Sequence, residues 1–224
     1  LAYSPTAPVG TAFPTLPSAP LADDALLIHT LKRMTFGATP EMIEKAKRLG
    51  IHAFIEEQLF PESIPDDAPD KTLEQFTTFD MTPTERFKLE KKALPVQELI
   101  VATLLRQRYS ERQLFETMVD FWGNHFSIFI GKNGCRVLKT DDDLQAIRPN
   151  ALGKFRDLLY ASAHSPAMLV YLDQAESRSK APNENYAREL MELHTIGVDS
   201  GYSHHDVVEV ARALTGWTIV GPRD

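Results

Sequence analysis

Apolar residues recur at intervals of three and four positions along most of the chain, and this spacing is typical of amphipathic helices. The best-delimited example lies between Asn183 and Gly197. Pro182 cannot continue a preceding helix, Asn183 is a favourable N-cap, and Gly197 supplies the left-handed conformation that ends many helices. The pattern therefore predicts a single helix of about three and a half turns.

The two sides of this predicted helix differ in chemistry. At about 100° of rotation per residue, one face is apolar and consists of Tyr186, Ala187, Leu190, Met191 and Leu193. His194 falls near the middle of that face and Glu189 at its border. On the opposite side, Arg188 is spaced by four residues from both Glu184 and Glu192, so two ion pairs are expected. A buried imidazole and a half-buried carboxylate need partners, and those partners are expected to decide the function.

Start and stop signals predict further helices along the chain. Their expected ranges are 24–35, 40–49, 51–60, 83–93, 96–109, 111–130, 141–147, 151–163, 166–172 and 204–215. Residues 61–81 are expected to form a loop with one short helix around 73–79, and only 217–220 is a candidate strand. The predicted fold is all-α, a multi-helix bundle of about eight to ten helices.

The predicted helix 111–130 is apolar over most of its circumference, which is typical of a helix in the centre of a bundle. A capping box formed by Ser110 and Gln113 is expected to begin it. Its polar residues form a narrow stripe that includes Asp120 and Asn124, whereas His125 lies within the apolar arc. This helix and the helix after Asn183 therefore each bury a histidine next to acidic or amide groups.

Three consecutive aspartates follow Thr140, which is expected to cap a short helix ending at Ile147. The spacing of a calcium-binding EF-hand loop is absent around Asp141, Asp142 and Asp143. We therefore expect these carboxylates to serve helix capping and a solvated surface.

Composition excludes several classes of protein. The formal net charge of -7 and the absence of clustered basic residues argue against nucleic-acid binding. No apolar run approaches the roughly 20 residues of a membrane span. Cys135 is the single cysteine, which excludes an internal disulfide and a cysteine-rich metal site. Residues 1–22, rich in Pro, Ala, Ser and Thr, are expected to be an extended or disordered tail, and 23–224 a helical domain.

The two histidine-bearing helices suggest a polar pocket if they pack against each other. Asp120, His125, Glu189 and His194 are then the candidate catalytic groups. Asn124, Trp122, Asn185, Arg188 and Glu192 are candidates for substrate binding. A divalent metal of unknown identity would use Glu189, Glu192 and His125, although the paired Glu-x-x-His motifs of di-iron bundles are absent. Alternatively, these groups form a buried network that only fixes the packing.

Motifs of common enzyme classes are missing. The chain has no G-x-S-x-G nucleophile elbow, no phosphate-binding loop, no G-x-G-x-x-G fingerprint and no H-E-x-x-H. Local sequence therefore gives no support for the hydrolase, kinase, dehydrogenase or zincin classes that these motifs mark.

Several stretches resemble a large family of uncharacterised bacterial proteins, domain of unknown function family 1800. They are LKRMTFGATP, MVDFWGNHFSIF, ALGKFRDLL, SPAMLVYLD, NENYARELMELHTIGVDSGY and DVVEVARALTGWTI, in that order along the chain. The resemblance extends over roughly residues 26–218. It implies an extracytoplasmic location, because family members are typically exported, although residues 1–21 lack the features of a signal peptide. Members usually continue past the TGWT stretch, so the chain is expected to be an N-terminal part of a longer domain.

Two functional hypotheses remain open at this point. The first is an enzyme whose buried acid and histidine groups act on an unknown substrate. The second is a non-catalytic interaction or assembly module. The resemblance implies a partner for the second hypothesis, because genes of this family often neighbour those of exported proteins that resemble sulfatases and alkaline phosphatases.

Overall fold

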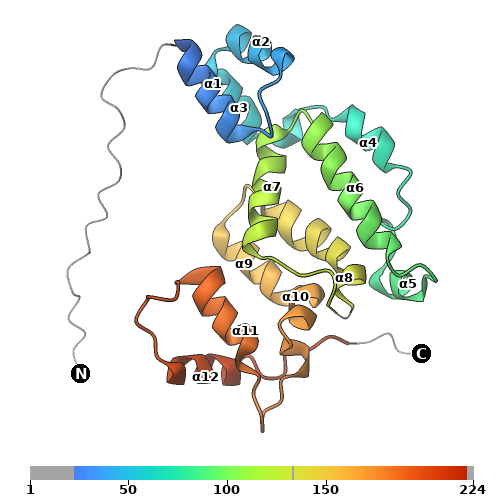
Figure 1. The fold of residues 1–224 in the computed structure, drawn as a ribbon, viewed down its shortest axis with the longest axis vertical. Helices are drawn as coiled ribbons and strands as arrows, with labels where there is room; N and C mark the ends of the chain where they lie inside the picture. The colour runs from blue at the N-terminus through green and yellow to red at the C-terminus, as the bar shows by residue number, and fades with distance from the viewer. Residues whose placement is uncertain (1–22, 133, 221–224) are drawn as a thin grey trace.

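The computed structural model describes residues 23–132 and 134–220, and the predicted tail 1–22 lies outside them (Figure 1). The described residues form twelve α-helices without a sheet, so the predicted all-α fold is confirmed. The only β-bridge in this part of the chain joins Arg178 and Ala181. The α-helices are α1 (Asp23–Met34), α2 (Pro40–Leu49), α3 (Ile51–Leu59), α4 (Asp67–Leu73), α5 (Pro83–Lys88), α6 (Leu94–Tyr109), α7 (Gln113–His125), α8 (Cys135–Asp141), α9 (Phe155–His164), α10 (Pro166–Tyr171), α11 (Glu184–Glu189) and α12 (His204–Ala213).

Two π-helical segments continue two of these helices. The first, η2 (Asp142–Ile147), follows α8, and the second, η5 (Leu190–Thr195), follows α11. Short 3₁₀ turns are η1 (Pro61–Ser63), η3 (Arg148–Asn150) and η4 (Gln174–Glu176). None of the helices in residues 23–220 combines the length and apolar character needed to cross a membrane.

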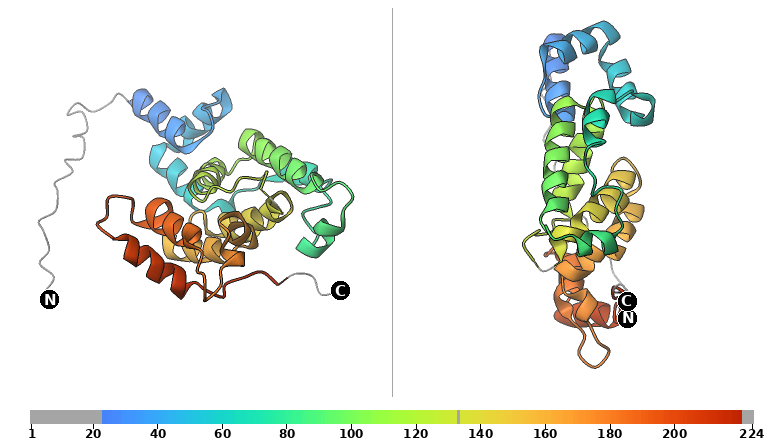
Figure 2. Two further views of the ribbon diagram at one scale, coloured as in Figure 1. Left: turned by 60° about the horizontal axis from the view of Figure 1, so that its bottom comes forward. Right: turned by 90° about the vertical axis from the view of Figure 1, so that its right-hand side faces the viewer.

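The helices are arranged along an elongated body (Figures 1 and 2). The first three helices lie at one end, where Leu27, Leu31, Ala46 and Phe54 form a small apolar core. Helices α11 and α12 lie at the other end, and Ala187, Val207 and Ala211 form the core between them. Helix α7 runs between these ends and contacts α1, α3, α6 and η2. Its ends are therefore tied to two different parts of the molecule.

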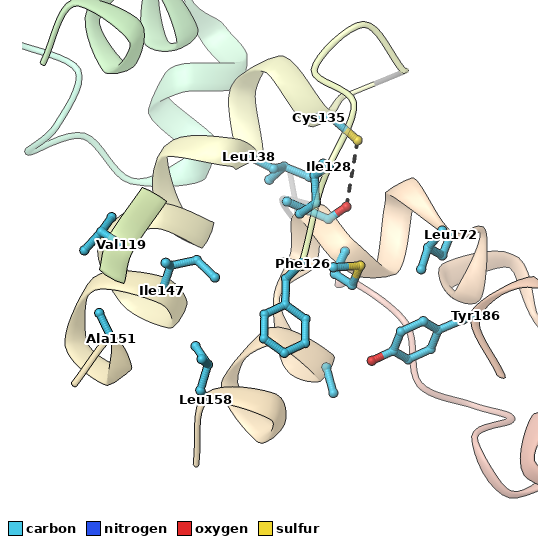
Figure 3. Close-up of a cluster of buried hydrophobic side chains, with 13 residues drawn as sticks. Val119, Phe126, Ile128, Cys135, Leu138, Ile147, Ala151, Leu158, Leu172 and Tyr186 are labelled. Carbon is cyan, nitrogen blue, oxygen red and sulfur yellow. Dashed lines mark hydrogen bonds between the residues drawn. The ribbon is translucent and has the colours of Figure 1, made fainter. Parts of the chain in front are cut away.

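The main apolar core lies where α7 to α11 come together (Figure 3). Phe126, Ile147 and Met168 are fully buried there. The other members are Val119, Ile128, Cys135, Leu138, Ala151, Leu158, Ala163, Ala167, Leu172 and Tyr186. Burial of a large apolar side chain contributes about 1.5–3 kcal/mol, so this core is the main stabilising contact around the end of α7.

Local capping signals are confirmed at several helices. Thr82 and Glu85 form the predicted capping box of α5, and Ser203 and Asp206 form a second one at α12. The Asn183 side chain accepts a hydrogen bond from the Asn185 backbone at the start of α11. Each of these contacts joins residues two or three positions apart, which is why sequence spacing alone is sufficient to predict them.

The predicted start of α7 is wrong, because distant side chains cap this helix. Asp66 accepts hydrogen bonds from the Ser110 hydroxyl and the Glu111 backbone, both at 2.7 Å. Gln58 accepts from the Leu114 backbone at 3.1 Å. The expected Ser110–Gln113 box does not form, and the α-helix begins at Gln113. It also ends early, at His125, because the backbone leaves the helical region at Phe126 and directs that ring into the core.

Other boundaries differ for similar reasons. The short helix expected at 73–79 lies at Asp67–Leu73, and the helix expected from residue 151 begins at Phe155. Thr140 is not an N-cap but an interior residue of α8, and its hydroxyl bonds to the Pro95 carbonyl. Residues 217–220 form no strand.

The aspartates after Thr140 are not solvated, contrary to expectation. Asp141 pairs with Arg86 at 2.7 Å, and Asp142 pairs with Lys139 at 2.5 Å. Both Arg86 and Asp142 are almost completely buried. Burial is also the main cause that raises the pKa of Asp143, against nearby basic side chains that lower it. These acids therefore belong to a buried network of charges.

Candidate functional site

A polar pocket lies where the C-terminal ends of α7 and α10 meet α11 and η5. Its volume is about 530 Å³, which is within the usual range for small-molecule sites. It is lined by Asn124, His125, Ser127, Lys132, Tyr171, Leu172, Asn185, Glu189, Leu193 and His194. The pocket therefore collects side chains from segments that are far apart in sequence.

The wall formed by α11 and η5 is a continuous helix that changes type at Leu190. Helix α11 starts as predicted, and the backbone N–H groups of Ile196 and Gly197 both donate to the Met191 carbonyl at its end. Gly197 has a φ of 88°, as expected for the residue that ends the helix. The extra residue in each π-helical turn alters which side chains share a face. Leu193, predicted to be buried, is 63% exposed for this reason.

The two histidines meet at the C-terminal ends of their helices. The Nε2 atom of His125 lies 3.1 Å from the His194 backbone carbonyl. A carbonyl oxygen can only accept, so Nε2 of His125 carries the proton and Nδ1 is the acceptor of the neutral ring. The His194 ring is only 5% exposed and lies 5.1 Å from the Phe126 ring, between centroids. Burial and, to a smaller extent, the electrostatic effect of His125 lower the pKa of His194 to about 4, so His194 is neutral at pH 7.

Glu189 differs from most acids that line pockets in this molecule. Its side chain is half-buried and lines the pocket. Among the residues that the structure describes, no donor or cation forms a hydrogen bond or ion pair with its carboxylate. A half-buried carboxylate without such a partner remains available to a ligand.

The opposite wall holds a group that sequence reasoning missed. The Lys132 ammonium donates to the Tyr171 carbonyl at 2.5 Å and to the Asp173 carboxylate at 2.7 Å. The other carboxylate oxygen of Asp173 lies 3.5 Å from the Asn185 amide. Asp173 has a φ of 60°, and no other non-glycine residue in the described ranges has a positive φ. Aspartate tolerates this conformation better than most residues, but it is still strained.

Two backbone irregularities thus border the same pocket. Segment η5 provides the π-helical turn, and Asp173 provides the left-handed residue. Both kinds of irregularity are found often at functional sites. The only local signal for Asp173 was its position just after a predicted helix, and Lys132 lies 41 residues away from it in sequence.

The other candidate residues lie outside this pocket. Asp120 is exposed and accepts a hydrogen bond from Gln107 at 3.2 Å, in a groove between α6 and α7. Trp122 donates to the Ala151 carbonyl at 3.0 Å and packs against the main core. Arg188 forms the two predicted ion pairs, with Glu184 at 3.2 Å and with Glu192 at 3.5 Å. The pocket therefore brings together Asn124, His125, Asn185, Glu189 and His194, but not Asp120, Trp122, Arg188 or Glu192.

The separation of these candidates follows from the packing of the helices. Helix α7 does not pack along α11, and the two histidine-bearing segments meet through His125 of α7 and His194 of η5. Of the metal candidates, Glu189 and His125 line the pocket, whereas Glu192 pairs with Arg188 outside it. Residues 23–132 and 134–220 contain no group of three or more His, Cys, Asp or Glu residues that could hold a metal ion.

The comparison with protein families agrees with the resemblance noted in the sequence. The family model described as protein of unknown function, DUF1800, matches residues 29–224. No curated protein and no solved structure matches the chain. Because the matched region covers most of the sequence, the chain belongs to the DUF1800 family.

Proposed function

We propose that the pocket between α7 and η5 is a catalytic site in which Glu189 exchanges a proton with a small polar substrate. The observation that carries this proposal is the half-buried Glu189 carboxylate, which lines a pocket of about 530 Å³ without a described partner. Fully buried structural carboxylates are normally paired, whereas Glu189 is half-buried and open to the pocket. A group without a partner is available to accept a proton from a bound hydroxyl group or water.

The neighbouring groups support this role. The His194 carbonyl fixes the tautomer of His125, whose Nδ1 atom accepts a hydrogen bond from a ligand. Lys132 uses two of its three ammonium protons in the protein, and the third stabilises negative charge that develops on the substrate. In this arrangement Glu189 takes the proton, and Lys132 stabilises the resulting oxyanion. His194, buried and neutral, is a positioning residue.

The test is the activity of the purified chain on 4-nitrophenyl esters, phosphates and glycosides. We expect release of 4-nitrophenol from at least one class, and a loss of about 10²–10⁴-fold in Glu189→Gln, as for removal of a general base. The matched control is Glu56→Gln, because Glu56 is exposed on α3 at the far end of the molecule. Equal activity in both variants, or no activity of the wild type on any class, would refute the catalytic role.

A second candidate function, assembly with another protein, is favoured by a separate observation. Leu193, Ile196 and Val198 are all more than half exposed on the segment that leaves the pocket. Contiguous exposed apolar side chains mark many protein interfaces. The family resemblance suggests an exported protein similar to sulfatases and alkaline phosphatases as the partner, and an extracytoplasmic location for the complex. Failure of Ile196→Asp to weaken co-purification with that partner would argue against this interface.

A further inference from the structure

The hydrogen-bonding groups that remain free in the pocket define the kind of ligand it fits. They include both acceptors and donors. The Asn124 amide N–H groups point to the Asp120 backbone at 2.8 Å and to its carboxylate at 3.3 Å, which leaves the Asn124 carbonyl oxygen. The Asn185 amide approaches Asp173 through one N–H group, which leaves its second N–H group and its carbonyl oxygen. Both oxygens of Glu189 and Nδ1 of His125 complete the set of acceptors.

Donors are fewer. Lys132 has one ammonium proton left after its bonds to the Tyr171 carbonyl and to Asp173. The Ser127 hydroxyl group is exposed at the pocket and serves as donor or acceptor. A ligand that satisfies the pocket must therefore bring several donors and several acceptors.

This requirement discriminates between three chemical classes. A phosphate monoester dianion or a carboxylate has no donors and would face the charge of Glu189. A diamine has donors, but it would place a second positive charge beside Lys132. A neutral polyol satisfies both kinds of group, because each hydroxyl group donates and accepts.

The apolar part of the pocket wall restricts the chemical class of the ligand further. Leu172 and Leu193 line the same pocket, and Tyr171 lies next to Lys132. Sugar rings combine hydroxyl groups at their edges with apolar C–H faces, and small-molecule sites typically combine an apolar wall with a few placed polar groups. We infer that the pocket binds a neutral saccharide. This inference rests on the proposed function of the same pocket and names its substrate class.

The direct test is calorimetric titration of the wild-type chain with three neutral tetrasaccharides. The probes are β-1,4-linked glucose, α-1,4-linked glucose and β-1,4-linked N-acetylglucosamine, and the contrasting probes are putrescine and inorganic phosphate. We expect at least one saccharide to bind with a Kd of about 1 mM or lower, and Asn185→Ala to weaken it at least about tenfold. The control Gln145→Ala removes an exposed amide on η2 and should leave the Kd unchanged.

The outcomes separate this inference from the catalytic proposal. Absence of saccharide binding, binding of putrescine or phosphate alone, or an unaltered Kd in Asn185→Ala would overturn the saccharide class. Saccharide binding by the wild type, together with loss of turnover in Glu189→Gln, supports both proposals. Turnover of an ester or phosphate that depends on Glu189, without saccharide binding, would leave the catalytic role standing and refute the saccharide. Saccharide binding without turnover would support the saccharide class and refute the catalytic role.

Discussion

The two π-helical segments in the described part of the chain have different electrostatic surroundings. Segment η2 lies beside three ion pairs between buried or partly buried side chains. Arg86 pairs with Asp141, Lys139 with Asp142, and Arg148 with Glu116. Segment η5 follows Glu189, for which the described residues provide no such cation. A π-helical turn therefore occurs both beside paired charges and beside an open pocket.

Burial explains the difference. Asp142 is 1% exposed and Glu116 is 4% exposed, and an isolated charge at such sites would cost several kcal/mol. Glu189 faces a pocket of about 530 Å³, where water solvates the carboxylate in the absence of a ligand. Paired acids around η2 fix the fold, whereas the acid beside η5 is left free for a ligand.

The largest effect is expected at the paired network. Arg86→Ala removes the cation of Asp141 and two hydrogen bonds, from Nε to the Thr78 carbonyl and from a terminal nitrogen to the Phe79 carbonyl. Breaking a buried pair in this way costs about 3–5 kcal/mol, because an unpaired charge stays behind. Urea unfolding should show this loss. The control Arg136→Ala changes an exposed arginine on α8 and should stay within about 0.5 kcal/mol of the wild type.

A smaller, pH-dependent effect is expected at His194. Its pKa is about 4 in the folded protein, against 6.5 for the free side chain, because the ring is buried. The unfolded chain binds the proton between these values and the folded chain does not, so stability falls as the pH drops from 6.5 to 4. The full contribution is about 3 kcal/mol, present above pH 6.5.

The measurement compares wild type and His194→Gln by urea unfolding at a series of pH values. The difference in unfolding free energy should shrink on acidification across that window. His52→Gln provides the control, because His52 is exposed on α3 and its replacement should leave the pH dependence unchanged. Parallel curves for wild type and His194→Gln would show that the imidazole is not held neutral by burial.

Much of the fold was predictable because its signals are local. The caps at Thr39, Thr82 and Ser203 connect residues within three positions of each other, and helical periodicity placed His125 and His194 on buried faces. The start of α7 was not predictable in the same way. Its backbone groups bond to Asp66 and Gln58, 45 and 56 residues away from their partners. Such contacts form only after the chain has folded.

The candidate site was also predictable only where its signals are local. Glu189 was found because it lies at the border of an apolar face, and it does line the pocket. Asp120 was expected beside it on the assumption that α7 and α11 pack along their lengths, and that packing is not observed. Lys132 and Asp173 were missed, because neither lies in a periodic element and their pairing joins two loops. The π-helical register of η5 has no sequence signature at all in this chain.

The smallest effect gives the sharpest comparison between the two regions, because the same substitution is made in each. Glu116→Gln keeps the shape of the side chain but removes the charge that accepts two hydrogen bonds from Arg148, at 2.9 and 2.5 Å. Loss of a charged hydrogen bond at a buried site costs about 2 kcal/mol. Glu189→Gln breaks no contact that the structure describes, so its unfolding free energy should stay within about 0.5 kcal/mol of the wild type. If instead Glu189→Gln destabilises the protein as much as Glu116→Gln does, then Glu189 belongs to the structural network. The pocket beside η5 then contains no carboxylate that is available to a ligand.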